Sequence, residues 1–275
     1  MLQAGGRLAE ALRVAETAVE VAQRAFPESD PSLALSYERV GQIHERGGQH
    51  DEAQRFLGKA LKAFEKVDPP DERAIFRLTR RLAYLCDRSG QEEEAIAHYE
   101  RAIETGSRLD DVLHSDLGTM LNNLALIYRR SGRQKAAEPC YVRALEIYEQ
   151  QLGREHADVA AVLNNLGVFY TSEGRFEEAE QAHQRALAIR IKAKPERHSD
   201  IAQSNCNLAV LYHSRGDFTR AGELYRESLR VWEEVAEPSQ DYEIVASNYA
   251  DLLRSLGKKR QAMAIETRVR RRRGR

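Results

Sequence analysis

A period of 42 residues runs through this 275-residue sequence and constrains its fold more than any other feature. The clearest copy extends from His156 to Arg197. Its landmarks Leu166-Gly167, Tyr170, Gly174, Ala179 and Ala186 recur one period away in both directions, as Leu124-Ala125, Tyr128, Gly132, Ala137 and Ala144, and as Leu208-Ala209, Tyr212, Gly216, Ala221 and Ser228. Self-similarity at a period of this length is typical of a repeat solenoid.

Each copy contains two amphipathic helical patterns joined by a short turn, so the sequence predicts an all-α solenoid of helix pairs. A glycine closes the first helix, where a left-handed residue is needed, at Gly48, Gly90, Gly132, Gly174, Gly216 and Gly257. Small residues are predicted to let the paired helices approach closely. In the first helix these are Gly41, Ala83, Ala125, Gly167, Ala209 and Ala250, and in the second Ala53, Ala95, Ala137, Ala179, Ala221 and Ala262. Three tyrosines are expected to bury aromatic area between helices, Tyr128, Tyr170 and Tyr212.

The period predicts a single repeat domain over residues 1–275. It consists of a half unit (1–31), five full units (32–70, 71–113, 114–155, 156–197 and 198–240), a terminal unit (241–267) and an arginine-rich tail (268–275). The half unit contains one second-type helix without its first helix. Because the end of such a stack needs a cap, a cap or a partner is expected over its apolar face.

Composition narrows the function classes. Apolar residues make up 42% of the chain, and charged residues make up 31% with a net charge of −1, which suits exposed helices with many opposite-charge neighbours. No run of 18 apolar residues and no secretory signal occur in the sequence. Cys86, Cys140 and Cys206 are far apart, which favours core packing in a reducing compartment. We therefore expect a cytoplasmic protein.

The landmarks resemble those of the tetratricopeptide repeat, with a unit of 42 rather than 34 residues. The pattern H-x-D-V-A-x-x-L-N-N-L-x-x-x-Y at residues 156–170 and the pattern E-A-E-x-x-x-x-R-A-L-x-I at residues 178–189 resemble the kinesin light chain type, and the chain is similar to bacterial kinesin-light-chain-like proteins found with bacterial tubulins. The resemblance implies antiparallel helix pairs in a right-handed superhelix with a concave groove. It also implies a non-enzymatic scaffold whose partner is a protein, with bacterial tubulin filaments as the best candidate. The sequence has no sustained heptad pattern, so attachment to a motor protein is not implied.

Catalytic and metal sites are not predicted. His114, His156 and His198 recur at one period, each two residues before an aspartate. One repeat is about 10 Å long, too far for shared coordination at about 2 Å. The histidines are therefore expected near loops, with the aspartates at helix N-termini as caps or as charges on the helix dipole. No catalytic motif is present, and no cofactor is expected.

The expected partner surface combines amides and arginines. In the family, the position before the landmark leucine faces the concave side, and an asparagine occupies it at Asn123, Asn165, Asn207 and Asn248, with Asn122 and Asn164 beside the first two. An amide offers both a donor and an acceptor to an extended segment; alternatively, these asparagines bond only within the stack. Further inferred groove positions form a basic patch, namely Arg77, Arg80, Arg81, Tyr84, Arg88, Arg129 and Arg130. The patch fits an acidic partner, or it is a solvated helix face.

The tail has six arginines in eight residues, Arg268, Arg270, Arg271, Arg272, Arg273 and Arg275. It could bind an acidic protein surface, nucleic acid or anionic lipid, or it could be a basic helix end that the helix dipole favours. Nucleic acid is the weaker choice because the rest of the chain is acidic. A peptide-sensing regulator and an adaptor that uses this tail are therefore the alternatives to a filament-binding scaffold.

Overall fold

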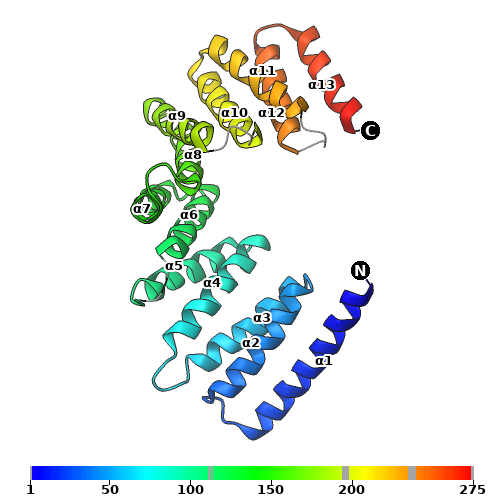
Figure 1. Cartoon of the computed structure of the whole chain (residues 1–275), viewed down its shortest axis with the longest axis vertical. Coiled ribbons are helices and arrows are strands. Elements are labelled where there is room, and N and C mark those ends of the chain that lie inside the picture. Colours follow the sequence, from blue (N-terminus) through cyan, green and yellow to red (C-terminus); the bar gives the residue numbers. More distant parts are fainter. Residues whose placement is uncertain (1, 111, 113, 194–197, 235–239, 274–275) are drawn as a thin grey trace. The chain divides into compact units, whose positions relative to one another are not determined.

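The computed structural model describes residues 2–110, 112, 114–193, 198–234 and 240–273, and their side chains except those of residues 2–7, 198 and 273. Within these ranges the chain forms thirteen α-helices and no strand (Figure 1). The helices are α1 (Leu2–Ala25), α2 (Pro31–Arg46), α3 (His50–Phe64), α4 (Glu72–Arg88), α5 (Glu92–Gly106), α6 (His114–Arg130), α7 (Gln134–Leu152), α8 (Ala157–Ser172), α9 (Phe176–Ala193), α10 (His198–Arg215), α11 (Phe218–Glu234), α12 (Gln240–Ser255) and α13 (Lys259–Arg273).

The chain divides into two compact units, Met1–Cys140 and Tyr141–Arg275, here called unit 1 and unit 2. In unit 1 the pairs α2–α3 and α4–α5 pack most extensively, and α1, α3 and α5 each pack on the helix that follows. In unit 2 the pairs are α8–α9, α10–α11 and α12–α13, with α9 on α10 and α11 on α12. The predicted all-α solenoid of helix pairs is therefore confirmed within each unit.

The turn inside each helix pair has the predicted left-handed glycine. Positive φ angles between 72° and 87° occur at Gly48, Gly90, Gly132, Gly174, Gly216 and Gly257. The next residue then donates its N–H to a carbonyl five positions back, as Arg175 does to Tyr170 at 2.9 Å. This Schellman bond satisfies a carbonyl at the helix end, which is why the same glycine returns in every copy.

Two positions of each repeat, one in the first helix and one in the second, control the approach of the paired helices. The small residues of the first helix are buried, and a Cβ added to Gly167 would lie 2.7 Å from the His183 ring. A Cβ at Gly41 would lie 2.8 Å from Leu57. Leu57 and His183 belong to one set of equivalent second-helix residues, all at most 2% exposed: Leu57, Tyr99, Tyr141, His183 and Tyr225.

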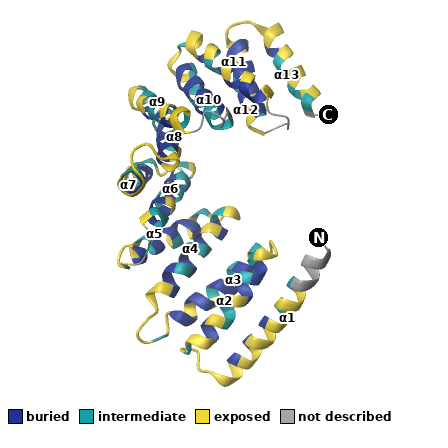
Figure 2. Cartoon of the chain, viewed as in Figure 1, coloured by how far each residue is buried: buried dark blue, intermediate teal, exposed yellow. Residues whose placement is uncertain are grey.

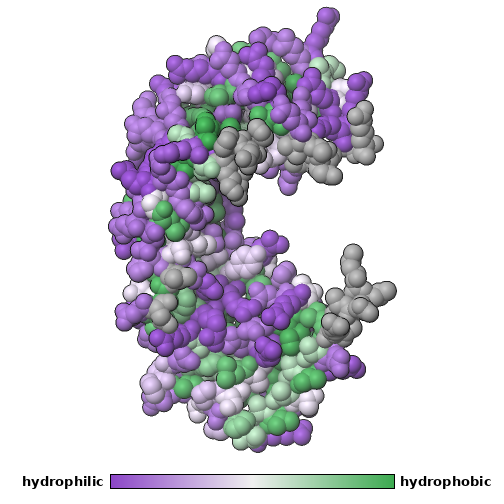
Figure 3. Space-filling model, viewed as in Figure 1, coloured by the Kyte–Doolittle hydropathy of each residue, from purple (hydrophilic) through white to green (hydrophobic). Residues whose placement is uncertain are grey.

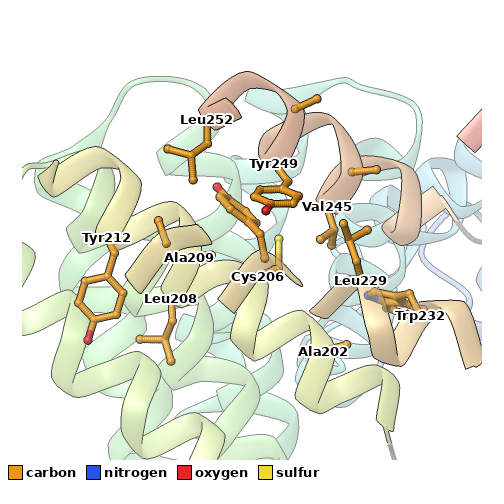
Figure 4. Close-up of a cluster of buried hydrophobic side chains, with 14 of the residues drawn as sticks. Ala202, Cys206, Leu208, Ala209, Tyr212, Leu229, Trp232, Val245, Tyr249 and Leu252 are labelled. Atoms are coloured by element: carbon orange, nitrogen blue, oxygen red, sulfur yellow. The ribbon is translucent and has the colours of Figure 1, made fainter. Parts of the chain in front are cut away.

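The core of unit 2 shows how the repeats share their apolar faces (Figure 4). Leu208 and Ala209 of α10, Leu229 and Trp232 of α11 and Val245 of α12 belong to one buried cluster. Cys206 lies in this cluster, where burial raises the pKa of its thiol to about 11. Its burial agrees with the predicted packing role of the cysteines.

Helix starts follow the predicted chemistry in part. The Asp30 carboxylate accepts the Ser32 N–H at 2.8 Å, with Pro31 in the first turn of α2. In α8 the N-cap is His156, whose Nδ1 accepts the Asp158 N–H, so Asp158 supplies charge to the first turn rather than the cap. Pro139 lies inside α7, which continues through it.

Candidate functional site

Four of the sequence-predicted site residues of unit 1 meet in a hollow between α4 and α6. It has a volume of about 240 Å³ and is lined by Arg80, Arg81 and Tyr84 of α4, Thr119, Met120 and Asn123 of α6, and Tyr99, Glu45 and Asp116. Three adjacent helices supply most of it because α4 and α6 are the first helices of successive repeats, with α5 packed on both. Four predicted residues thus share one surface.

The floor of this hollow is apolar and ordered. Tyr99 and Met120 are each only 2% exposed. The Asn123 amide nitrogen donates to the Tyr99 hydroxyl at 3.3 Å, and burial raises the pKa of Tyr99 to about 12. The phenol therefore stays protonated at physiological pH and holds the amide in place.

The rim is charged but locally balanced. Arg80 pairs with Asp116 at 3.1 Å, and Arg81 donates from Nε to a Glu45 carboxylate oxygen at 3.1 Å. Two arginines therefore face two carboxylates in the same hollow. The basic patch expected from the sequence is present, but its charge is largely neutralised by residues of neighbouring helices, which the sequence pattern did not indicate.

Outside the hollow, other arginines of the patch are also paired with carboxylates of neighbouring helices. Arg77 donates two hydrogen bonds to the buried Glu38 carboxylate, at 2.9 and 2.8 Å. This pairing raises the pKa of Arg77. Arg130 donates to Asp87 at 2.7 Å and to Glu92 at 3.1 Å. Arg129 is half-buried in α6. Successive first helices are thus joined by arginine–carboxylate pairs.

Two members of the patch project into solvent. Tyr84 is 48% exposed, and Arg88, one turn further along α4, is exposed with no ion pair among the described residues. An exposed aromatic ring at the edge of a hollow is the residue type that most often dominates a protein interface. Tyr84 is therefore the strongest single candidate for contact with a partner.

The predicted asparagines of unit 2 are half-buried, and two of them bond to each other. The Asn207 amide nitrogen donates to the Asn164 oxygen at 2.6 Å, and Gln203 donates to Asn207 at 3.2 Å. Asn248 bonds to Cys206, where its amide lowers the thiol pKa against the effect of burial. Asn122 and Asn165 also have interactions within the chain. These amides therefore have bonds within the stack.

The arginine tail is mostly helix. α13 runs to Arg273, so the terminal unit and the tail are continuous. Arg268 pairs with Glu233 at 2.6 Å, while Arg272 donates to the Trp232 and Glu233 carbonyls at the end of α11 and lies over the Tyr242 ring. Arg270 and Arg271 are exposed; Arg275 and the Arg273 side chain lie outside the described part of the chain.

Sequence reasoning missed two parts of this site. It did not single out Tyr99, although Tyr99, Tyr141 and Tyr225 recur at whole multiples of the period and were visible as such. It also did not pair the arginines with Glu38, Glu45 and Asp116, because ion pairs between repeats depend on helix rotation rather than on spacing.

Among the described residues, none of the helices combines the length and the hydropathy that a membrane span requires.

The helix pairs, their glycine turns and the open hollow define a class: a helical repeat protein that presents surfaces for binding. The chain belongs to the tetratricopeptide repeat family, whose models match residues 1–66, 116–192 and 200–274, and residues 39–111. This family serves as protein–protein interaction scaffolds, and its fold is typically non-enzymatic.

Solved structures support the kinesin light chain type predicted from the motifs. BtubC (BKLC) from P. vanneervenii is 28% identical, with a TM-score of 0.63 over 82% of this chain and 91% of that one. Putative kinesin light chain repeats from Podosopora anserina are 21% identical, with a TM-score of 0.60 over 74% and 95% of the two chains. YrrB, a repeat protein with an unusual peptide-binding site, is 17% identical, with a TM-score of 0.54 over 80% and 94%. The last two show the fold alone. No curated protein matches the sequence.

Proposed function

We propose that the hollow between α4 and α6 anchors a protein partner, and that the partner is a bacterial tubulin filament. The observation that supports this most directly is the convergence of Arg80, Arg81, Tyr84 and Asn123 on one surface. The likeness to BtubC (BKLC) at 28% identity supports the choice of partner.

The size and lining of the hollow favour one large apolar or aromatic side chain. Its volume of about 240 Å³ lies below the roughly 300–1,000 Å³ of small-molecule pockets. Tyr84 and Met120 supply apolar contact, and the Asn123 amide supplies hydrogen bonding to a backbone. Acidic residues of the partner, next to the side chain in the hollow, would replace Asp116 and Glu45 as partners of Arg80 and Arg81. Binding therefore exchanges existing ion pairs and does not use unpaired arginines. A rigid, preformed surface loses little entropy on binding.

The test is co-sedimentation of the whole chain with filaments of bacterial tubulin. We expect saturable binding that Tyr84→Ala weakens by tenfold or more, about 1.4 kcal/mol, and that Arg88→Glu also weakens. Val142→Ala, at an exposed apolar position of α7 in unit 2, is the matched control and should bind like the parent chain. Absence of co-sedimentation at low salt would reject tubulin as the partner.

Charge reversal at Arg80 and Arg81 would change the stability of the chain as well as its binding. Each reversal places two negative charges against each other, at Asp116 or at Glu45. The double variant should therefore lose stability as well as binding, and its melting temperature must be measured beside its affinity. Tyr84→Ala avoids this problem because it removes an exposed ring.

A further inference from the structure

One face of α1 is uncovered, although the equivalent face of the next second-type helix, α3, is buried. Ala11, Val14, Ala18 and Val21 are exposed, Val14 at 66% and Val21 at 58%. Figure 2 shows α1 exposed along most of its length, and Figure 3 shows hydrophobic surface over it. One period later, in α3, the equivalent residues are 0% to 9% exposed: Ala53, Phe56, Ala60 and Ala63.

The period identifies what covers this face in α3, since α2 packs on α3 more extensively than any other pair. α2 brings a small residue, Gly41, against Leu57 of α3, where a Cβ would lie 2.8 Å from the leucine. The equivalent of Leu57 in α1 is Ala15. A hollow of about 550 Å³ lies along α1 beside α2, lined by Ala11, Val14, Ala15 and Ala18 on one side and by Arg39, Gln42, Ile43 and Arg46 on the other, with Glu10 at its edge. Its lining residues span about two turns of each helix.

Charge specifies the occupant independently of shape. Arg39 is equivalent to Arg81, which donates to Glu45 on the preceding first helix. Arg46 is equivalent to Arg88, which is exposed without an ion pair among the described residues, and to Arg130, which donates to Asp87 on its preceding first helix. Glu45 and Asp87 are themselves one period apart, so both arginines address one carboxylate position. Arg39 and Arg46 are exposed and have no ion-pair partner among the described side chains.

We propose that this groove of α1 and α2 binds an amphipathic helix of a partner protein. The helix has an apolar face that packs on Val14, Ala15 and Ala18, and a carboxylate near its C-terminal end, aligned with Arg39 and Arg46. This is a second binding surface in unit 1, separate from the hollow between α4 and α6, and it stands whether or not the chain binds tubulin.

The chain itself supplies a probe of the right chemistry. A labelled synthetic peptide of residues 30–47 contains α2 with its N-cap Asp30, its small residue Gly41 and its carboxylate Glu45. We expect saturable binding to the whole chain by fluorescence anisotropy. Glu45→Gln in the peptide should weaken it about fivefold, as expected for loss of an exposed ion pair worth about 1 kcal/mol.

Variants of the whole chain locate the site. Val14→Glu should weaken peptide binding more than tenfold without unfolding the chain, since Val14 is exposed. Met263→Glu on α13 is the matched control, because Met263 is also 66% exposed, and it should leave binding unchanged. Arg39→Glu with Arg46→Glu should weaken the parent peptide and bind a Glu45→Arg peptide better.

A fusion removes the dependence on peptide helicity. Residues 30–47 joined through a flexible linker ahead of Met1 act at high effective concentration. The fusion should raise the melting temperature, and Val14→Glu should abolish the gain. The proposal is overturned if neither peptide nor fusion shows an effect that Val14→Glu removes. It is also overturned if light scattering shows a dimer that Val14→Glu dissociates, because the occupant is then a second copy of this chain.

Discussion

Units 1 and 2 use the same 42-residue frame but place different chemistry at equivalent positions. In unit 1, the joints between successive first helices are arginine–carboxylate pairs such as Arg77 with Glu38 and Arg81 with Glu45. In unit 2, the equivalents of Arg77 and Arg81 are Gln203 and Asn207, and the joint is a network of amides.

The crossing inside a helix pair differs in the same way. Leu57 faces Gly41 in unit 1, whereas His183 faces Gly167 in unit 2. The frame thus fixes where a side chain lies and how close it comes to its neighbour, while the residue type is free to change as long as volume and hydrogen bonding are satisfied. Function therefore has to be sought in departures between equivalent positions, as at Tyr84 and Arg39.

The largest expected difference between the units is a pH dependence of unit 2. Burial, reinforced by the charge of Arg190, lowers the pKa of His183 from 6.5 to about 4. The unfolded chain then binds this proton more readily than the folded chain. The contribution of neutral His183 to the free energy of unfolding is therefore fully present above about pH 6.5. It is lost as pH falls towards 4, and the total loss is roughly 3 kcal/mol.

His183→Leu, which copies the leucine opposite Gly41, should remove this dependence. Chemical unfolding of both proteins at a series of pH values measures it. The difference between the two stabilities should be constant near and above pH 7 and should change on acidification; a difference that does not change with pH would show that His183 is not the titrating group.

The second comparison concerns the glycines at the crossings. Gly167→Ala should destabilise the chain by about 1–3 kcal/mol because the new methyl meets the buried His183 ring, which cannot rotate away. Gly41→Ala should cost a similar amount, because the new methyl meets the buried Leu57 side chain at 2.8 Å and the Leu57 backbone nitrogen at 3.1 Å.

Gly58→Ala is the control for these glycines. Gly58 lies inside α3 with nothing within 4 Å of the added methyl, so the substitution should stabilise the chain by about 0.5–1 kcal/mol. Thermal melting orders the three variants, and equal losses at Gly58 and Gly167 would remove close approach as the explanation.

Much of this frame could be predicted from the sequence, but the pairing between repeats could not. The period, the glycine turns and the small residues follow from local rules, because each depends on one backbone conformation or one close contact. The partners of Arg77 and Arg80 depend on how far one first helix is rotated against the next, which the spacing does not contain. The sequence placed Arg80, Arg81, Tyr84, Asn123 and the amides of unit 2 on one kind of surface. For the same reason, it could not show that only the first four line one hollow.

A third comparison tests the ion pairs of unit 1. Arg77→Gln leaves the Glu38 carboxylate, 5% exposed, without its cation, while Gln42 still donates to it. We expect a loss of about 2 kcal/mol, less than the roughly 3–5 kcal/mol of a fully buried pair because Arg77 is 41% exposed. Adding Glu38→Gln should recover most of this loss, and a double-mutant cycle in chemical unfolding measures the recovery. Additive losses would mean that the two side chains do not interact.

The smallest effect separates charge from amide bonding at equivalent positions. Asn207→Ala in unit 2 removes two amide hydrogen bonds at a half-exposed site and should cost about 1 kcal/mol. Arg81→Gln in unit 1 removes the pair with Glu45, whose two side chains are 27% and 24% exposed, and should cost a similar amount at low salt. Only the second loss should shrink between roughly 0.05 and 1 M NaCl, because mobile ions screen charges and leave amide bonds unchanged. If salt reduces both losses equally, the stabilisation by Arg81 and that by Asn207 do not differ in their dependence on charge. The proposed difference between ion pairs in unit 1 and amide bonds in unit 2 is then wrong.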